Sequence, residues 1–483
     1  MADHAKQLAS TLGVEHTLCT AELDAAAAMC AEKFPSGDPN IKLRIDLVRD
    51  RHVVLLVAQD GSIGIFEQLS VLLYLQRFPV PHSLAEYAAG KWKRTYADGR
   101  FDVCSAASIT VVVPWYSFCQ MERTSRWAVQ AGKWYNGKPE GEFVDVATAH
   151  TFAALLSAEP IEAGPIVPKQ LLLLDLHEIE DCERALNASG KWANRRAPYG
   201  LTHGTGTYFA SCFDYFLKHV LLPTLTDLSS SFVVFPDHGA HRRFYRMVAT
   251  QLAGISLSSV LFIQKSRVGA EVSQSEQLFY VDASGGTVER PDKLPPGSRV
   301  LIADDFTNSG STLFGGAEIV RRRSEGDVHV AAYVTHYVAK YDRPTVAKFV
   351  AKLYGEGEPA ALDHFYCSDS VARVVGWLRE EVSKRVGTPP RAQIVPVAPL
   401  VAEWIGANPL PTAAVSTAQA AYYAKIRPML EGRIAAAVNS AVEAAAEDPL
   451  AHVAAQLQRD ADRAAAAASF DGVSRAMRPD AMP

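Results

Sequence analysis

Short runs of apolar, often β-branched residues recur along the chain, and each is followed by a polar segment and then by helix-like spacing. Runs that are apolar at nearly every position indicate strands buried on both faces of a parallel sheet. Alternating strands and helices predict an α/β architecture, whose ligands bind at the carboxyl ends of the strands. We predict strands at 52–58, 109–114, 171–176, 232–236, 260–263, 299–303 and 328–335, and helices at 66–77, 147–156, 242–252 and 313–323.

Other segments break this alternation. Residues 190–207 are rich in Gly, Asn, Arg and Thr and are typical of a long loop or domain junction, and 133–142 form a polar insert. The polar stretch 270–296 predicts a mobile loop or a hairpin. From residue 406 the chain is alanine-rich, and apolar residues recur every fourth position from Ile426 to Val442. This spacing predicts a helical appendage, and a partly disordered tract remains an open alternative.

Charge and cysteine content narrow the class of protein. The 48 Lys and Arg residues against 53 Asp and Glu give a net charge of −5, which offers no general attraction to nucleic acid or to acidic membranes. No apolar run reaches the roughly 18 residues of a membrane span, and the N-terminus lacks an apolar signal core. Seven cysteines without a C-x-x-C pair indicate neither a disulfide framework nor a zinc site. We expect a cytoplasmic protein with buried cysteines.

The strongest local signal is the segment 299–318, RVLIADDFTNSGSTLFGGAE. A buried strand brings Asp304 and Asp305 to its end, a loop of hydroxyl side chains follows, and a helix begins. The hydroxyls can act as N-caps, the N–H groups at the helix start can hold a phosphate, and Gly310 allows close backbone approach. The two carboxylates can bind sugar hydroxyls directly or through Mg²⁺. The segment therefore predicts a site for a phosphorylated pentose.

This segment resembles the phosphoribosyl diphosphate (PRPP) loop of the type I phosphoribosyltransferase fold. With seven further motifs between about Phe34 and Ile405, the chain resembles the ribose-phosphate diphosphokinase, or PRPP synthetase, family, and within it the plant-type second class. The motifs are GIFEQLSVLLYLQRF (64–78), VVVPWYSFCQMERTSR (111–126), DVATAHTFAALL (145–156), LLLLDLHE (171–178), FVVFPDHGAHRRF (232–244) and FIQKSR (262–267), together with YVTHYV (333–338).

The resemblance implies two type I phosphoribosyltransferase-like domains, each a mainly parallel sheet flanked by helices. The ATP-side domain would span 1–205 and the domain with the sugar-phosphate loop 206–405, and the extension 406–483 lies outside the resemblance. The implied activity is Mg²⁺-dependent transfer of the diphosphoryl group of ATP to ribose 5-phosphate, which releases AMP and feeds nucleotide biosynthesis. The implied assembly is a homo-oligomer, or a hetero-oligomer with another synthetase subunit.

The resemblance also implies roles for individual residues. Lys265 and Arg267 match the catalytic K-x-R, and His177 and Asp237 match residues at the metal. For Arg242 and Arg243, surface solvation and a phosphate role stay equally open, and the aromatic run 115–118 is better explained by core packing than by adenine binding. The residues matched to ATP binding are Phe34, Glu122, Arg123 and His177, and those matched to ribose 5-phosphate are Asp304, Asp305, Thr307, Asn308, Ser309, Gly310, Ser311 and Thr312.

Three positions depart from the family pattern. Ser36 replaces an aspartate in an element that reaches a neighbour's ATP site in the family, and Asn308 and Ser311 are unusual in the sugar-phosphate loop. They motivate an alternative function: a catalytically weak or inactive regulatory or scaffold subunit on the same fold. A nucleobase phosphoribosyltransferase is a third possibility. Such enzymes are typically one domain of about 200 residues, whereas this chain has two strand–helix halves.

Overall fold

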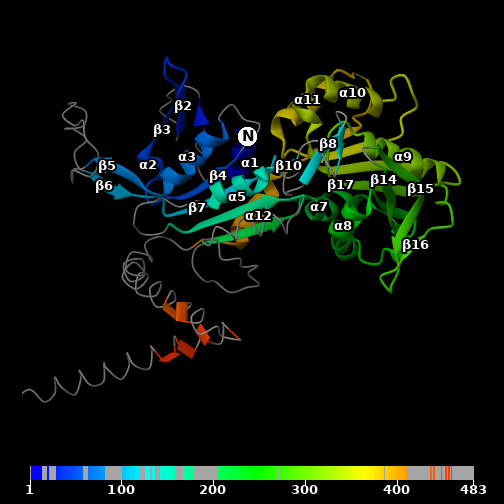
Figure 1. The fold of residues 1–483 in the computed structure, drawn as a ribbon. Coiled ribbons are helices and arrows are strands. Elements are labelled where there is room, and N and C mark those ends of the chain that lie inside the picture. The colour runs from blue at the N-terminus through cyan, green and yellow to red at the C-terminus, as the bar shows by residue number, and fades with distance from the viewer. Residues whose placement is uncertain are drawn as a thin grey trace, which may run out of the picture. The chain divides into compact units, whose positions relative to one another are not determined.

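The computed structural model of this chain describes most of the region up to residue 410. The described residues are 2–12, 19–20, 29–57, 64–81, 101–118, 126–130, 133–135, 142–144, 146–157, 167–177, 205–225, 227–268, 271–385 and 387–410, with short stretches between 436 and 459. The chain divides into two compact units, one of 1–160 with 167–411 and one of 161–166 with 412–483. The first unit contains the candidate site, so the description below concerns that unit (Figure 1).

The first sheet is four-stranded and wholly parallel. Its order is β12-β11-β7-β4, from β4 (His52–Leu56), β7 (Ser108–Val113), β11 (Lys169–Leu174) and β12 (Thr205–Ala210). Every residue of the two central strands, β7 and β11, is buried. This explains why these segments are apolar at nearly every position, because a central parallel strand contacts helices on both faces.

Helices cover both faces of this sheet. On one face, α3 (Ile65–Gln76) and α5 (Thr148–Ser157) pack against Ile109, Val111 and Leu171. On the other face, α1 (Ala2–Leu12) and α12 (Ala398–Ala407) pack against Val112 and Leu172. The helix α12 follows the last strand of the second sheet, and Gln170 Nε2 of β11 donates to the carbonyl of Asn408 at 3.1 Å. The chain therefore returns to its first sheet.

Small sheets accompany the first half. One is β1 (Cys19–Thr20), β2 (Met29–Lys33) and β3 (Pro39–Leu43), followed by α2 (Ile45–Val48). A second pairs β5 (Phe78–Pro81) with β6 (Phe101–Cys104). A third is antiparallel, from β8 (Arg126–Gln130), β9 (Lys133–Tyr135) and β10 (Glu142–Val144). The polar insert predicted at 133–142 therefore begins with one strand and ends at another.

The second sheet has eight strands in the order β16-β15-β14-β13-β17-β18-β19-β20, and it is parallel from β14 through β20. The hairpin alternative for 270–296 is confirmed, because β15 and β16 add to the sheet edge as antiparallel strands. The strands are β13 (Ser231–Phe235), β14 (Val260–Val268), β15 (Glu271–Val281), β16 (Thr287–Glu289), β17 (Arg299–Thr307), β18 (His329–Tyr337), β19 (His364–Ser368) and β20 (Ala392–Val395).

Helices also cover both faces of the second sheet, as Figure 1 shows. On one face lie α7 (Cys212–Phe216) and α8 (His238–Gln251), which pack on Leu301 and Ala303 of β17. On the other lie α9 (Ser311–Arg322), α10 (Arg343–Leu353) and α11 (Ala372–Ser383), which pack on Val300 and Ile302. Short helical turns are η2 (Leu217–Leu221), η3 (Leu222–Thr224), η4 (Leu257–Ser259) and η5 (Ala339–Tyr341).

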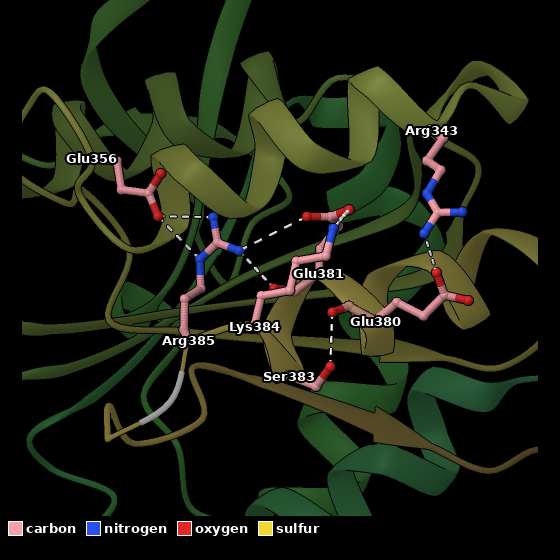
Figure 2. A network of polar contacts seen from close by, with 7 residues as sticks. All are labelled: Arg343, Glu356, Glu380, Glu381, Ser383, Lys384 and Arg385. Atoms are coloured by element: carbon pink, nitrogen blue, oxygen red, sulfur yellow. Dashed lines mark hydrogen bonds and ion pairs between the residues drawn. The ribbon is translucent and has the colours of Figure 1, made fainter.

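Polar contacts join α10 and α11 (Figure 2). Arg343, at the start of α10, pairs with Glu380 of α11. Arg385, just past α11, donates from Nε and Nη2 to Glu356 Oε1 at 3.1 and 2.8 Å, and from Nη1 to the carbonyl of Glu381 at 2.6 Å. Arg385 thereby fixes the end of α11 against the segment that follows α10.

The predicted α/β fold class is confirmed, and the predicted helices are present. Two strands are longer than predicted: β14 continues through Val268 and β17 through Thr307. Cys212 and Cys367 are buried thiols, as expected. Residues 205–207, predicted as part of a loop, begin β12. Residues 190–204, and the five apolar residues that recur every fourth position from Ile426 to Val442, lie outside the described part of the chain. None of the described helices is long and apolar enough to cross a membrane.

Candidate functional site at the carboxyl ends of the two sheets

The two aspartates lie inside β17, not after it, so the prediction that they share the strand's end is wrong. Successive strand residues point to opposite faces of a sheet. Asp305 therefore shares a face with Ala303, which packs under α7 and α8, and Asp304 shares a face with Ile302, which packs under α9. Asp305 is buried and Asp304 is partly exposed. The two residues also interact: Asp304 Oδ1 accepts from the N–H of Asp305 at 3.0 Å, and a hydrogen bond with the Asp304 side chain helps to lower the pKa of Asp305. The two carboxylates therefore differ in burial although they lie close together.

Asp305 is the buried member of a charged cluster with Arg243 of α8 and His177, whose side chains are 17% and 29% exposed. Asp305 Oδ2 pairs with Arg243 Nη1 and accepts a hydrogen bond from His177 Nδ1 at 2.7 Å, and Arg243 Nη2 lies 3.4 Å from the same Nδ1. Burial alone would raise the pKa of Asp305, but the Arg243 charge and the His177 hydrogen bond outweigh it and hold the pKa well below its ordinary value. Asp305 is therefore ionised across the physiological range.

His177 comes from the first sheet, three residues past the end of β11, and Asp175 explains its position. Asp175 has a left-handed backbone (φ 36°), which an aspartate tolerates and which ends the strand. Its Oδ2 accepts hydrogen bonds from the N–H groups of Cys212 at 2.9 Å and Phe213 at 3.2 Å, and from Thr335 Oγ1 at 2.5 Å. Burial raises the pKa of Asp175, and these bonds oppose the rise. Asp175 thus joins β11 to α7 and to β18.

His336 and Trp115 pack beside this junction. His336 Nδ1 lies 2.8 Å from Ser370 Oγ, its Nε2 lies 3.3 Å from the carbonyl of Asp175, and its ring centroid is 4.5 Å from that of Trp115. Trp115 Nε1 donates to the hydroxyl of Tyr341 at 2.6 Å. Trp115 is buried, as the core-packing interpretation predicted. The carboxyl ends of the two sheets therefore meet in one polar, largely buried junction.

The loop after β17 ends in an unusual N-cap. The N-cap residue of α9 is Gly310, with φ 78° and no side chain to cap with, so the prediction of a hydroxyl residue at the N-cap position is wrong. A loop hydroxyl still meets the helix start, because Ser309 Oγ accepts from the N–H of Ser311 at 3.4 Å. Ser311 is the first helical residue and needs no left-handed backbone, which explains how serine is accepted there. The Oδ1 of Asn308 accepts from the N–H of Lys340 at 3.2 Å. The first N–H groups of a helix lack intrahelical acceptors, so the start of α9 is suited to an anion.

Three predicted residues lie on neighbouring strands of the same sheet. Asp237, after β13, is the N-cap of α8, and its Oδ1 accepts from the N–H of Ala240 at 2.9 Å. Lys265 and Arg267 lie within β14, where they pair with Gln274 and Val272 of β15. Since β14 and β17 both flank β13, their backbones run about two strand spacings, roughly 10 Å, apart. The side chains of Lys265 and Arg267 are outside the described part of the structure.

The remaining predicted ATP residues are not brought to this junction by the described part of the structure. Phe34 lies half-exposed in the turn between β2 and β3, in a different sheet. In the same turn, Ser36 Oγ donates to Asp38 Oδ2 at 2.7 Å. Glu122 and Arg123 fall outside the described residues.

Sequence reasoning missed four contributors to the junction: Asp175, Arg243, Thr335 and His336. One signal was present for Asp175, because it follows a fully apolar strand at the edge where ligands bind. Arg243 stands six residues after Asp237, which puts it in the second turn of α8, but only the fold shows that it faces Asp305.

The oxygen donors at this edge suit Mg²⁺. Among the described residues, no group of three or more His, Cys, Asp and Glu side chains could hold a metal by itself. Mg²⁺ is usually held by one or two carboxylates together with substrate phosphates and water. Asp237, two residues after β13, and Asp304, in the adjacent strand β17, are carboxylates of this kind. The chain's own residues therefore fit a metal that a phosphorylated ligand helps to bind.

No protein-family model and no curated relative matches the chain. Among solved structures, phosphoribosylpyrophosphate synthetase from Mycobacterium smegmatis matches with a TM-score of 0.50 and 16% identity over 84% of this chain and 95% of that one. Purine phosphoribosyltransferase from Pyrococcus horikoshii (TM-score 0.18, 16% identity, 26% of this chain and 78% of that one) and adenine phosphoribosyltransferase from Leishmania donovani (0.22, 15%, 50% and 98%) match too weakly to bear on the fold. The chain therefore has two mainly parallel sheets flanked by helices, matching the two-domain phosphoribosyltransferase-like fold of PRPP synthetase.

Proposed function

We propose that this protein synthesises 5-phosphoribosyl 1-diphosphate from ATP and ribose 5-phosphate by Mg²⁺-dependent diphosphoryl transfer, with release of AMP. The observation that carries the proposal is the meeting of two strand ends. The end of β17, which contains Asp304, and the loop from Thr307 to the start of α9 lie at the carboxyl end of the second sheet. His177, at the carboxyl end of the first sheet, contacts Asp305 of β17. Transfer between a diphosphoryl donor bound to one half of the fold and a sugar-phosphate acceptor bound to the other requires the two sites to lie this close together.

Each half has a separate task in the proposed reaction. The N–H groups at the start of α9 and the loop 307–312 would bind the 5-phosphate, and Asp304, on the α9 face of β17, would bind the ribose hydroxyls. His177 and Asp237 would bind the nucleotide with its metal, together with Phe34, Glu122 and Arg123. We propose domain limits of 1–205 and 206–405, and an oligomer in which the β2–β3 turn reaches a neighbouring subunit.

Phosphoryl transfer depends on positioning and on neutralising charge, not on covalent catalysis by the protein. Bound Mg²⁺ would supply Lewis-acid neutralisation of the phosphate oxygens. The chain's own cations, Lys265 and Arg267 on β14, would approach the transferring phosphates, where each would stabilise charge that develops in the transition state. Asp237 can serve both its helix and a metal, since a carboxylate has about four lone-pair sites.

The direct test is AMP release by the full chain in millimolar Mg²⁺, with and without ribose 5-phosphate. We expect release only with both substrates, and a loss of about 10²- to 10³-fold in turnover for Lys265→Ala. The matched control is Lys352→Ala, an α10 lysine whose side chain is 45% exposed, which should leave turnover unchanged. No turnover by the folded wild type, with Mg²⁺·ATP also unbound, would reject the proposal in favour of a non-catalytic subunit.

The finer assignment within the family is also a proposal. The plant-type second class is suggested by F-E-Q at 66–68, E-R at 122–123 and P-D-x-G-A at 236–240. The unusual Ser311 is compatible with an active loop, because Gly310 takes the left-handed conformation instead.

A further inference from the structure

We infer that Asp305 is a positioning residue for His177 and not a ligand of the pentose. This inference rests on the proposed function for its consequence, but its structural basis is independent of any substrate. The sequence assigns Asp305 to the ribose 5-phosphate site, yet its carboxylate is already bound by other side chains of the protein. Its side chain is 4% exposed, and Oδ2 alone contacts both Arg243 and His177.

The ion pair with Arg243 joins Asp305 to the helix opposite the sugar-phosphate loop. The helix α9 packs on the face of β17 to which Ile302 belongs, whereas Arg243 comes from α8, which packs on the face of Ala303. Asp304 is the more exposed of the two acids and is the one left to bind a pentose at the start of α9. To bind the same pentose, Asp305 would have to break its ion pair with Arg243, which is strongly unfavourable for a buried carboxylate.

The contact with His177 fixes the ring. At 2.7 Å from a carboxylate oxygen, Nδ1 must carry the proton, because an ionised carboxylate only accepts. The guanidinium of Arg243 only donates, so its 3.4 Å approach to a protonated Nδ1 is not a hydrogen bond, and its partner is the Asp305 carboxylate. In the Nδ1–H tautomer, Nε2 is the acceptor nitrogen of the ring. A carboxylate behind a histidine is a recurrent way to orient a ring towards a metal.

Arg243 completes the arrangement by balancing charge. A lone ionised aspartate would be strongly destabilised by burial, and the guanidinium of Arg243 permits Asp305 to remain ionised where it contacts His177. The edge of the His177 ring also packs against Phe306, with centroids 5.3 Å apart. The ring is therefore held by a hydrogen bond on one side and by an aromatic contact on another, both from β17. The nucleotide-side histidine is thus oriented by the strand that begins the sugar-phosphate loop.

The test compares Asp305→Asn with Asp304→Asn, which changes the adjacent acid on the other face of β17. Histidine-labelled protein without ligands gives the first readout: NMR should show the Nδ1–H tautomer of His177 in the wild type and in Asp304→Asn, and a mixture of tautomers in Asp305→Asn. Calorimetry with Mg²⁺·ATP and with ribose 5-phosphate gives the second. Asp305→Asn should weaken Mg²⁺·ATP binding about 10- to 100-fold, and Asp304→Asn should weaken ribose 5-phosphate binding instead.

Several outcomes would overturn the inference. One is a His177 tautomer that Asp305→Asn leaves unchanged, and another is a loss of ribose 5-phosphate binding in Asp305→Asn as large as in Asp304→Asn. If the wild type binds neither ligand, the proposed function fails, and the tautomer alone then decides the inference. If Asp305→Asn does not fold because Arg243 is left unpaired, the double variant Asp305→Asn/Arg243→Gln removes both charges and is used for the same measurements.

Discussion

Gly310 lies against the ring of Phe349 so closely that no side chain fits between them. A Cβ on Gly310 would stand 2.5 Å from Phe349 Cε2 and 3.0 Å from Phe314 Cε2, and Gly310 has φ 78° besides. The residue is therefore restricted twice, by the space around it and by its left-handed backbone. This contact fixes where the loop after β17 ends and where α9 begins.

Gly310→Ala should destabilise the protein by about 2–3 kcal/mol, because the left-handed backbone and the contact with Phe349 both penalise a methyl group. The measurement is the free energy of unfolding in urea. The control is Gly376→Ala, in the middle of α11, where a Cβ meets nothing within 4 Å and the backbone is helical. That substitution should be neutral or stabilise by up to about 1 kcal/mol. Equal losses in both variants would contradict the assignment.

Of the two arginines in the polar network of Figure 2, Arg385 should contribute more to the free energy of unfolding than Arg343. Arg385 is 17% exposed in its side chain, donates to Glu356 and Glu381, and lies 5.4 Å from the ring centroid of Tyr354. We expect Arg385→Ala to lower the free energy of unfolding by about 1–2 kcal/mol. Arg343→Ala, which breaks an exposed pair with Glu380, should cost less than about 1 kcal/mol. The reverse order would show that the exposed pair stabilises the two helices more.

The free energy of unfolding should decrease as the pH is lowered, and His336 should contribute to this decrease. Burial lowers the pKa of His336 from 6.5 to about 4, so the folded protein keeps the ring neutral while the unfolded chain takes up a proton. As the pH falls from about 6.5 to about 4, this group should therefore cost about 1.4 kcal/mol of stability per pH unit, and the cost is absent above that window.

The measurement is urea unfolding at several pH values in that window, for the wild type and His336→Gln. The variant should be less stable at neutral pH, because the contacts with Ser370 and the Asp175 carbonyl change, but its stability should decline less steeply with acid. Parallel pH profiles for the two proteins would mean that another group dominates the acid sensitivity.

Asp237 should differ from another aspartate with the same local role. Asp237 caps α8, and Asp342 caps α10 by accepting from the N–H of Thr345 at 3.0 Å. Replacing either by alanine should cost about 1 kcal/mol of stability. Under the proposed function only Asp237→Ala should also lower AMP release, by at least about 10²-fold, whereas Asp342→Ala should keep it. Full activity in Asp237→Ala would remove this residue from the proposed metal site.

Much of this fold follows from patterns that act locally. Apolar runs gave the strands of both sheets, because a strand between two layers of helices has no exposed face on which a polar residue is favourable. The longer course of β17 was not predictable in this way. Asp304 and Asp305 look like a strand end in sequence, and only pairing with β18 up to Tyr337 makes them part of the strand.

The site was harder to predict than the fold. Asp304, His177 and the loop to Ser311 were found because each follows a buried strand or precedes a helix. The partners of Asp305 come from residues 128 and 62 positions earlier in the chain, and no local pattern links them. Arg243 in particular has the sequence context of a solvated helix residue. Its burial depends on how two sheets meet, which is a property of the assembled chain.

The return of α12 to the first sheet makes the two halves depend on one another. A chain cut after Val395 would retain all eight strands of the second sheet yet lose α12, one of the two helices that cover Val112 and Leu172 in the first sheet. Neither half should therefore fold normally when it is expressed alone, and the two halves should unfold together. Separate unfolding transitions for the two halves in a calorimetric scan would contradict this dependence on α12.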